Sequence, residues 1–76
     1  MLFGVKMYIQ YEKDEVCAIF DTLKKAKEYA KKRADNDENW TESYYIQKFK
    51  LNDPEYKQEE DFNISFETKY LKKMEE

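Results

Sequence analysis

Residues 3–11 alternate between hydrophobic or aromatic side chains and mostly polar ones. A period of two places every second side chain on the same face of an extended strand. The pattern therefore predicts a first strand with one buried face. The residues predicted to share that face are Phe3, Val5, Met7, Ile9 and Tyr11.

The polar tetrapeptide 12–15 contains no glycine, which is typical of a four-residue hairpin loop built on a type I turn. Residues 16–20 then form a short, nearly continuous hydrophobic run. We interpret this run as a second strand that pairs with the first.

Residues 22–34 show the period of an amphipathic helix. Asp21 or Thr22 can act as its N-cap, and basic residues in its last turn suit the negative end of the helix dipole. A stripe of mostly small side chains predicts close packing against a sheet. The stripe consists of Leu23, Ala26, Ala30 and Ala34.

A polar loop over residues 35–41 contains Trp40, which either folds back over the end of the core or marks an interface. Residues 43–51 alternate again and predict a third strand, which ends before Pro54 because proline has no backbone donor. One face of this strand carries Tyr45, Gln47, Phe49 and Leu51, and the other carries Tyr44, Ile46, Lys48 and Lys50.

The C-terminal third of the chain is acidic. Residues 54–61 fit either a short helix, with Asp53 as its N-cap, or an ordered loop. Residues 62–70 alternate and predict a fourth strand, whereas residues 72–76 are expected to fray.

Together these elements predict an α+β fold of the order β-β-α-β-β, in which one long helix packs on one face of a small antiparallel sheet of three to four strands. We expect a single domain over residues 1–76, with its core in residues 3–51. Residues 52–76 would form an acidic connector and the fourth strand. One helix covers only one face of a sheet. The side chains expected on the uncovered face are Tyr8, Tyr44, Ile46 and several lysines.

The chain combines an N-terminal hairpin, the helix sequence FDTLKKAKEYA at residues 20–30 and the aromatic strand YIQKFKL at residues 45–51. This combination resembles the small uncharacterised ββαβ domains of low-GC bacteria and their phages. The resemblance covers residues 5–51. It implies the same fold and a phage or mobile-element origin, and it implies no functional residue.

The net charge of −3 is unevenly distributed. Residues 22–34 carry six basic residues and one glutamate, whereas residues 1–21 sum to −2 and residues 35–76 sum to −6. Charged residues make up 41% of the chain and the mean hydropathy is −1.10, which by itself favours disorder. Aromatic residues, at 17% and with strand-like spacing, favour a folded domain instead.

Cys17 is the only cysteine, so no internal disulfide can hold the fold together. No segment approaches the roughly 20 apolar residues of a membrane span, and the N-terminus lacks the pattern of a signal peptide. We therefore expect a cytoplasmic protein that does not associate with membranes.

The chain has no histidine, so the most common general base and metal ligand is missing. The single glycine, Gly4, excludes a glycine-rich phosphate loop, and Cys17 lies among apolar neighbours that leave its thiol unactivated. Residues 35–39 are similar to the start of an EF-hand loop, but Trp40 and Ile46 occupy the positions that need glycine and glutamate. We expect no enzymatic activity, no cofactor and no metal.

Seven tyrosines exceed what one small core can bury. Tyrosine contributes a large contact area at an interface and loses little entropy there. Our leading hypothesis is a non-enzymatic protein-binding module, encoded by a phage or mobile element, that inhibits or modulates a host protein or forms a homodimer. The residues predicted for that interface are Tyr8, Tyr44, Ile46, Trp40 and Tyr56.

Two alternatives involve nucleic acids. Lys24, Lys27 and Lys31 line one side of the predicted helix and could contact phosphates, although the acidic body and the scarcity of arginine disfavour this partner. The acidic segment 53–61 could instead mimic a phosphate backbone and inhibit a nucleic-acid enzyme, although Lys57 interrupts its negative charge.

Overall fold

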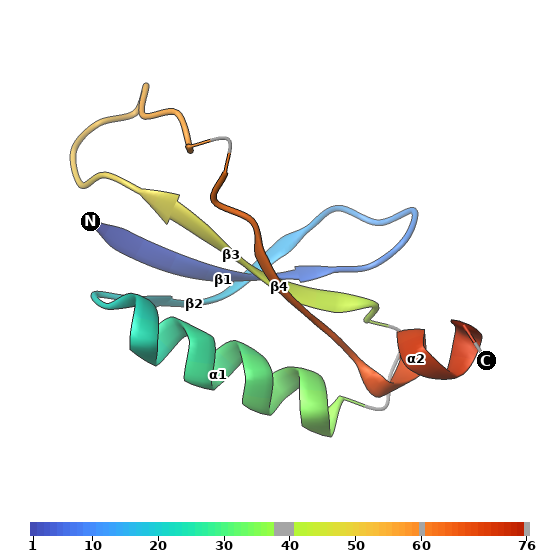
Figure 1. The fold of residues 1–76 in the computed structure, drawn as a ribbon. Helices are drawn as coiled ribbons and strands as arrows, with labels where there is room; N and C mark the ends of the chain where they lie inside the picture. Colours follow the sequence, from blue (N-terminus) through green and yellow to red (C-terminus); the bar gives the residue numbers. More distant parts are fainter. Residues whose placement is uncertain (38–40, 60, 76) are drawn as a thin grey trace.

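A computed structural model describes residues 1–37, 41–59 and 61–75, with side chains as far as residue 73. Within these residues the chain forms four strands and two helices (Figure 1). In chain order they are β1 (Leu2–Tyr8), β2 (Glu15–Phe20), α1 (Leu23–Asn36), β3 (Ser43–Phe49), β4 (Ile64–Glu67) and α2 (Lys69–Glu75).

The four strands form one sheet in the order β2-β1-β3-β4, and each neighbouring pair is antiparallel. Because β2 and β3 lie on either side of β1, α1 crosses the sheet on its way from β2 to β3. Figure 1 shows α1 along one face of the sheet, with α2 beside its C-terminal end. The predicted α+β class with a small antiparallel sheet is confirmed.

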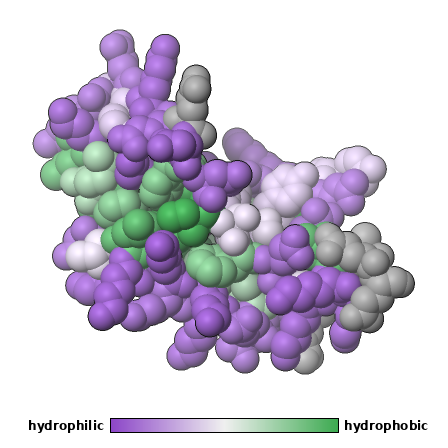
Figure 2. Space-filling model, in the orientation of Figure 1, coloured by the Kyte–Doolittle hydropathy of each residue, from purple (hydrophilic) through white to green (hydrophobic). Residues whose placement is uncertain are grey.

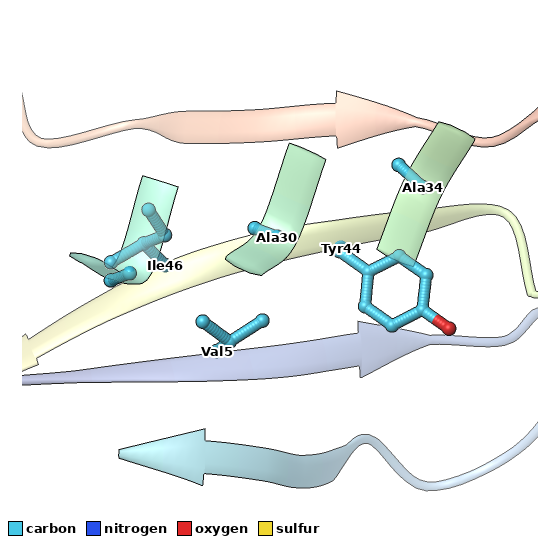
Figure 3. Close-up of a cluster of buried hydrophobic side chains, with 6 residues drawn as sticks. Val5, Ala30, Ala34, Tyr44 and Ile46 are labelled. Atoms are coloured by element: carbon cyan, nitrogen blue, oxygen red, sulfur yellow. The ribbon is translucent and has the colours of Figure 1, made fainter. Parts of the chain in front are cut away.

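Three alanines allow α1 to pack closely on the sheet. Ala26, Ala30 and Ala34 are fully buried and contact a core that includes Val5. Figure 3 shows this cluster between helix and strands. The helix begins after Thr22, whose hydroxyl accepts a hydrogen bond from the Lys25 amide at 3.3 Å. Such a cap satisfies one of the amides that have no partner in the first turn.

β1 is shorter than the alternation of residues 3–11 predicts, because it ends at Tyr8. Beyond it, the Glu12 amide donates to the Ile9 carbonyl at 3.1 Å, and Tyr11 has a φ of 67°. A positive φ belongs to the left-handed region, which turns the chain out of a strand. The hairpin loop therefore covers residues 9–14 rather than 12–15.

The C-terminal part of the chain differs most from the prediction. β4 comprises only Ile64–Glu67, and α2 occupies Lys69–Glu75, where the sequence predicts the end of a strand and a frayed tail. The described part of residues 54–61 contains no helix and forms an ordered loop. Gln58 holds this loop to β3, because its side-chain oxygen accepts from the Lys48 amide at 2.9 Å and its nitrogen donates to the Phe62 carbonyl at 3.1 Å.

Tyr44 and Ile46 lie on the covered face of the sheet, contrary to the prediction. Ile46 pairs with Val5 of β1, and Tyr44 pairs with Met7. Directly opposed residues share one face, so both side chains point toward α1 (Figure 3), where their exposures are 0% and 1%. Alternation along a strand separates two faces but does not say which one a helix will cover.

Candidate functional site

The face of the sheet that α1 leaves uncovered carries hydrophobic side chains at one end. Along β1, Leu2 and Gly4 point to the face opposite that of the buried Val5. Their partners in the neighbouring strands, Phe49 and Ile19, lie on the same uncovered face. Figure 2 shows hydrophobic side chains gathered at the end of the molecule where β1 begins and β3 ends. We call this surface the open-face patch. Its residues are Leu2, Val16, Ile19, Phe49 and Leu51.

A β-bulge in β2 creates part of this patch. Val5 pairs with Ala18 and Lys6 pairs with Val16, so Cys17 is an extra residue in the ladder. A bulge resets the alternation of side chains along its strand. Val16 and Ile19 consequently share the uncovered face, with exposures of 54% and 56%, although they are three residues apart.

Gly4 lies under an aromatic ring at the centre of the patch. A β carbon at this position would lie 3.1 Å from Cε1 of Phe49, so the ring occupies the space that a side chain would need. The Phe49 ring thereby covers the Gly4 backbone.

A shallow pocket of about 430 Å³ borders the patch. The turn after β3 forms its rim, where the Asp53 amide donates to the Lys50 carbonyl at 3.3 Å and Asn52 has a φ of 63°. Leu51 projects from this turn and is 64% exposed. The lining residues are Leu2, Phe49, Lys50, Leu51, Asn52, Asp53 and Pro54.

The other end of the uncovered face is polar. The Tyr45 hydroxyl donates a hydrogen bond to the Asp14 carboxylate, which joins the β1–β2 loop to β3. Burial raises the pKa of Tyr45 to about 12, and this hydrogen bond contributes to the shift. Lys6 pairs with Tyr45 in the ladder, so charged and polar groups border the patch on this side.

The residues that the sequence predicts for a protein interface are not brought together. Tyr8 lies on the uncovered face at the end of β1 and is partly exposed. Tyr56 is half-buried in the loop after β3, and Trp40 lies outside the described residues. Tyr44 and Ile46 are buried under α1, so they do not belong to an exposed surface.

Tyr44 takes part in a polar cluster at the C-terminal end of α1. Its hydroxyl donates to Oδ2 of Asp37 at 2.5 Å and accepts from Nη2 of Arg33 at 3.4 Å. Nη1 of Arg33 donates to the Tyr29 hydroxyl at 2.9 Å. Burial, followed by the hydrogen bond to Asp37, raises the pKa of Tyr44, so this hydroxyl keeps its proton.

This polar cluster lines a pocket of about 320 Å³ beside Met7. Among the described residues, no buried side-chain nitrogen or oxygen lacks a hydrogen-bond partner. The cluster therefore satisfies its own polar groups and anchors the end of α1 to β3.

The three lysines of the nucleic-acid alternative, Lys24, Lys27 and Lys31, are all exposed on α1. Lys25 differs, because its ammonium pairs with Asp21 at 3.1 Å.

Part of the acidic connector is attached to the sheet. Glu59 forms an ion pair with Lys48 at 3.0 Å, and the Lys48 ammonium lies 4.8 Å from the centre of the Phe62 ring. This contact neutralises one of the carboxylates that a phosphate mimic would have to present.

A metal site, a reactive thiol and a membrane span each place requirements on the described residues. No three His, Cys, Asp or Glu residues there are close enough to hold a metal ion. Burial raises the pKa of the half-buried Cys17 thiol, which disfavours the reactive thiolate. Within the same residues, no helix is long and apolar enough to cross a membrane.

Comparisons with protein-family models, curated proteins and solved structures gave no match. The resemblance to small ββαβ domains stays a prediction, and the candidate functions rest on the geometry of this chain. The exposed pair Val16 and Ile19 is the part of the site that the sequence does not reveal, because a continuous hydrophobic run predicts burial rather than a bulge.

Proposed function

We propose that this chain is a small non-enzymatic protein-binding module whose open-face patch binds a second copy of the chain. The supporting observation is the exposure of Val16 and Ile19 beside Leu2 and Phe49 on one face of the sheet, with the exposed Leu51 in the adjoining turn. Removing apolar surface from water lowers the free energy by about 25 cal/mol for each Å² that is buried. An apolar centre with a polar rim is also the usual anatomy of a protein interface.

The charges on this face favour a second copy as the partner. Lys6 and Glu67 lie on the uncovered face, and Lys50 and Asp53 lie beside the adjoining pocket. A two-fold contact places the same surface on both sides, so it requires a surface without a strong charge of one sign. The uncovered face meets this requirement, whereas the lysine-rich surface of α1 would repel its own copy.

The test replaces the two exposed β2 residues with neutral polar ones, in the variant V16Q/I19Q. We expect wild type to elute in size-exclusion chromatography with light scattering at twice the 9.4 kDa monomer mass, at both low and high salt. Salt should have little effect because the contact is mainly apolar. The variant should be monomeric with an unchanged circular dichroism spectrum.

Tyr11, which is 96% exposed in the hairpin loop, provides the matched control. Y11Q also removes an exposed hydrophobic group but leaves the patch intact, so this variant should stay dimeric. A monomeric wild type at every concentration, or a V16Q/I19Q variant that remains dimeric, would overturn the proposal. If wild type stays monomeric, the partner that binds the open-face patch would have to be a different protein.

A further inference from the structure

A row of lysines lies on the flank of α1 that faces α2. Lys24, Lys27 and Lys31 are three and four residues apart, which places them on one side of the helix. Tyr29 contacts Phe20 of β2, with ring centroids 5.4 Å apart, so the Tyr29 side of α1 faces the β2 edge. Lys31, two residues further on, is rotated by about 160° from Tyr29 around the axis. It therefore faces the opposite side, where α1 contacts β4 and α2.

The second helix, α2, contacts α1 and carries three more lysines. Thr68 is buried, and Tyr70 and Leu71 are half-buried, so they hold α2 against the rest of the molecule. The three lysines of α2 are exposed. We call the combined surface the lysine flank. Its residues are Lys24, Lys27, Lys31, Lys69, Lys72 and Lys73.

The lysine flank is strongly positive although the whole chain is acidic. Glu28 and Asp35 are the acidic residues of α1 and lie next to the flank on its outer side. When Glu75, the acidic residue of α2, is counted as well, six lysines and three carboxylates give a net charge of +3. All six lysines are exposed, so no other part of the described chain covers the flank.

We propose that the lysine flank binds the phosphate backbone of double-stranded DNA without reading the bases. Lys24 to Lys31 spans about 10 Å at 1.5 Å per residue, which suits a row of phosphates rather than a single anion. Lysine ammonium groups act as point charges, which is sufficient for contacts that depend on counterion release.

Among the described side chains of α1 and α2 there is no exposed aromatic ring, which favours a duplex over a single strand. Single-stranded nucleic acids are usually bound by basic grooves in which bases stack on aromatic side chains. Tyr29 lies on the other side of α1, and Tyr70 is half-buried. The flank therefore offers charge but no stacking platform.

The test measures the salt dependence of binding to a short fluorescent DNA duplex by anisotropy. Six phosphate contacts predict a slope of log K against log salt of about −5, equivalent to a loss of about 10³-fold between about 50 and about 200 mM salt. K24Q/K27Q/K31Q and K69Q/K72Q/K73Q should each reduce the slope to about −3. Glutamine keeps the helix propensity close to that of lysine.

The matched control is K13Q/K25Q/K57Q, which changes the net charge equally at three exposed lysines outside the lysine flank. It should leave the slope unchanged. The proposal would be wrong if wild type does not bind the duplex at low salt, if the control weakens binding as much as the lysine-flank variants, or if a single strand binds more tightly. None of these outcomes depends on the oligomeric state, so they are distinct from failure of the proposed dimer.

Discussion

Two neighbouring tyrosines in β3 perform similar roles on opposite faces of the sheet. The Tyr44 hydroxyl donates a hydrogen bond to Asp37 on the covered side, and the Tyr45 hydroxyl donates one to Asp14 on the uncovered side. The first bond connects β3 to the C-cap of α1, seven residues earlier, and the second connects it to the β1–β2 loop, 31 residues earlier. A hydrogen bond to a charged group contributes about 1.5–3 kcal/mol, more than one between neutral groups. These two tyrosines therefore hold other segments against β3. They do not supply the exposed aromatic surface that the seven tyrosines of the chain suggest.

Because of the Tyr45–Asp14 hydrogen bond, the free energy of unfolding should change with pH in the alkaline range. Y45F removes the hydroxyl and should lower the free energy of unfolding at neutral pH by about 1.5–3 kcal/mol. The pKa of Tyr45 rises from 10.0 to about 12 on folding, so the folded state holds this proton more tightly than the unfolded state. The stabilisation is therefore complete below pH 10 and is lost as pH rises toward 12.

Urea unfolding of wild type and Y45F at several pH values tests this expectation. The difference in unfolding free energy between the two proteins should narrow between pH 10 and 12, because only wild type can ionise at position 45. Y11F is a suitable control, since Tyr11 is exposed and the effect of its hydroxyl on stability should be small. A wild-type advantage that stays constant across this range would contradict the assignment.

At the level of secondary structure, the buried Thr68 is a main attachment of α2, in addition to the half-buried Tyr70 and Leu71. The Thr68 hydroxyl donates to the Thr41 carbonyl at 2.5 Å, with the Glu42 carbonyl at 3.1 Å, and accepts from the Leu71 amide at 3.3 Å. The Thr68 amide also donates to the Glu42 carbonyl at 3.0 Å. Thr68 is thus the cap of α2 and its attachment to the segment before β3. A seven-residue helix would be marginal in water without such support.

T68V keeps the shape of this side chain and removes its hydrogen bonds. We expect a loss of about 1–2 kcal/mol in the free energy of unfolding, because a buried cap is lost. Hydrogen exchange should become faster in the amides of α2 and stay unchanged in α1. T22V, which removes the exposed cap of α1, is the matched control and should have a smaller effect on α2. Unchanged protection of α2 in T68V would show that other contacts hold this helix.

At the level of the whole molecule, the sheet separates two surfaces of different character. The uncovered face presents the open-face patch with charges of both signs around it. The helical side presents the lysine flank. A dimer formed through the uncovered faces would direct its two lysine flanks away from each other, so one short duplex would contact one flank.

This arrangement predicts that the two binding activities can be removed independently. V16Q/I19Q should abolish dimerisation and keep the DNA slope of wild type, because it changes no charge. K24Q/K27Q/K31Q should reduce the DNA slope and remain dimeric. Light scattering and anisotropy on the same samples measure both properties. A lysine variant that dissociates the dimer would indicate that the two surfaces overlap.

Local patterns predict most of the regular structure correctly. The alanine stripe and the N-cap identify α1, and alternation identifies β1 and β3 as strands, because these signals arise from neighbouring residues. The lysines of α1 are likewise visible in the sequence as one exposed side of a helix. The β-bulge at Cys17 is not visible, because a run of apolar residues fits an unbroken buried strand equally well.

Other features follow from contacts between distant segments. The burial of Tyr44 and Ile46 depends on their register with β1, and α2 depends on the hydrogen bond from Thr68 to the chain 27 residues earlier. The joining of two groups of lysines into one flank depends in turn on the position of α2. Helix and strand propensities act over a few residues, whereas the choice of covered face and the meeting of two helices depend on how the whole chain packs.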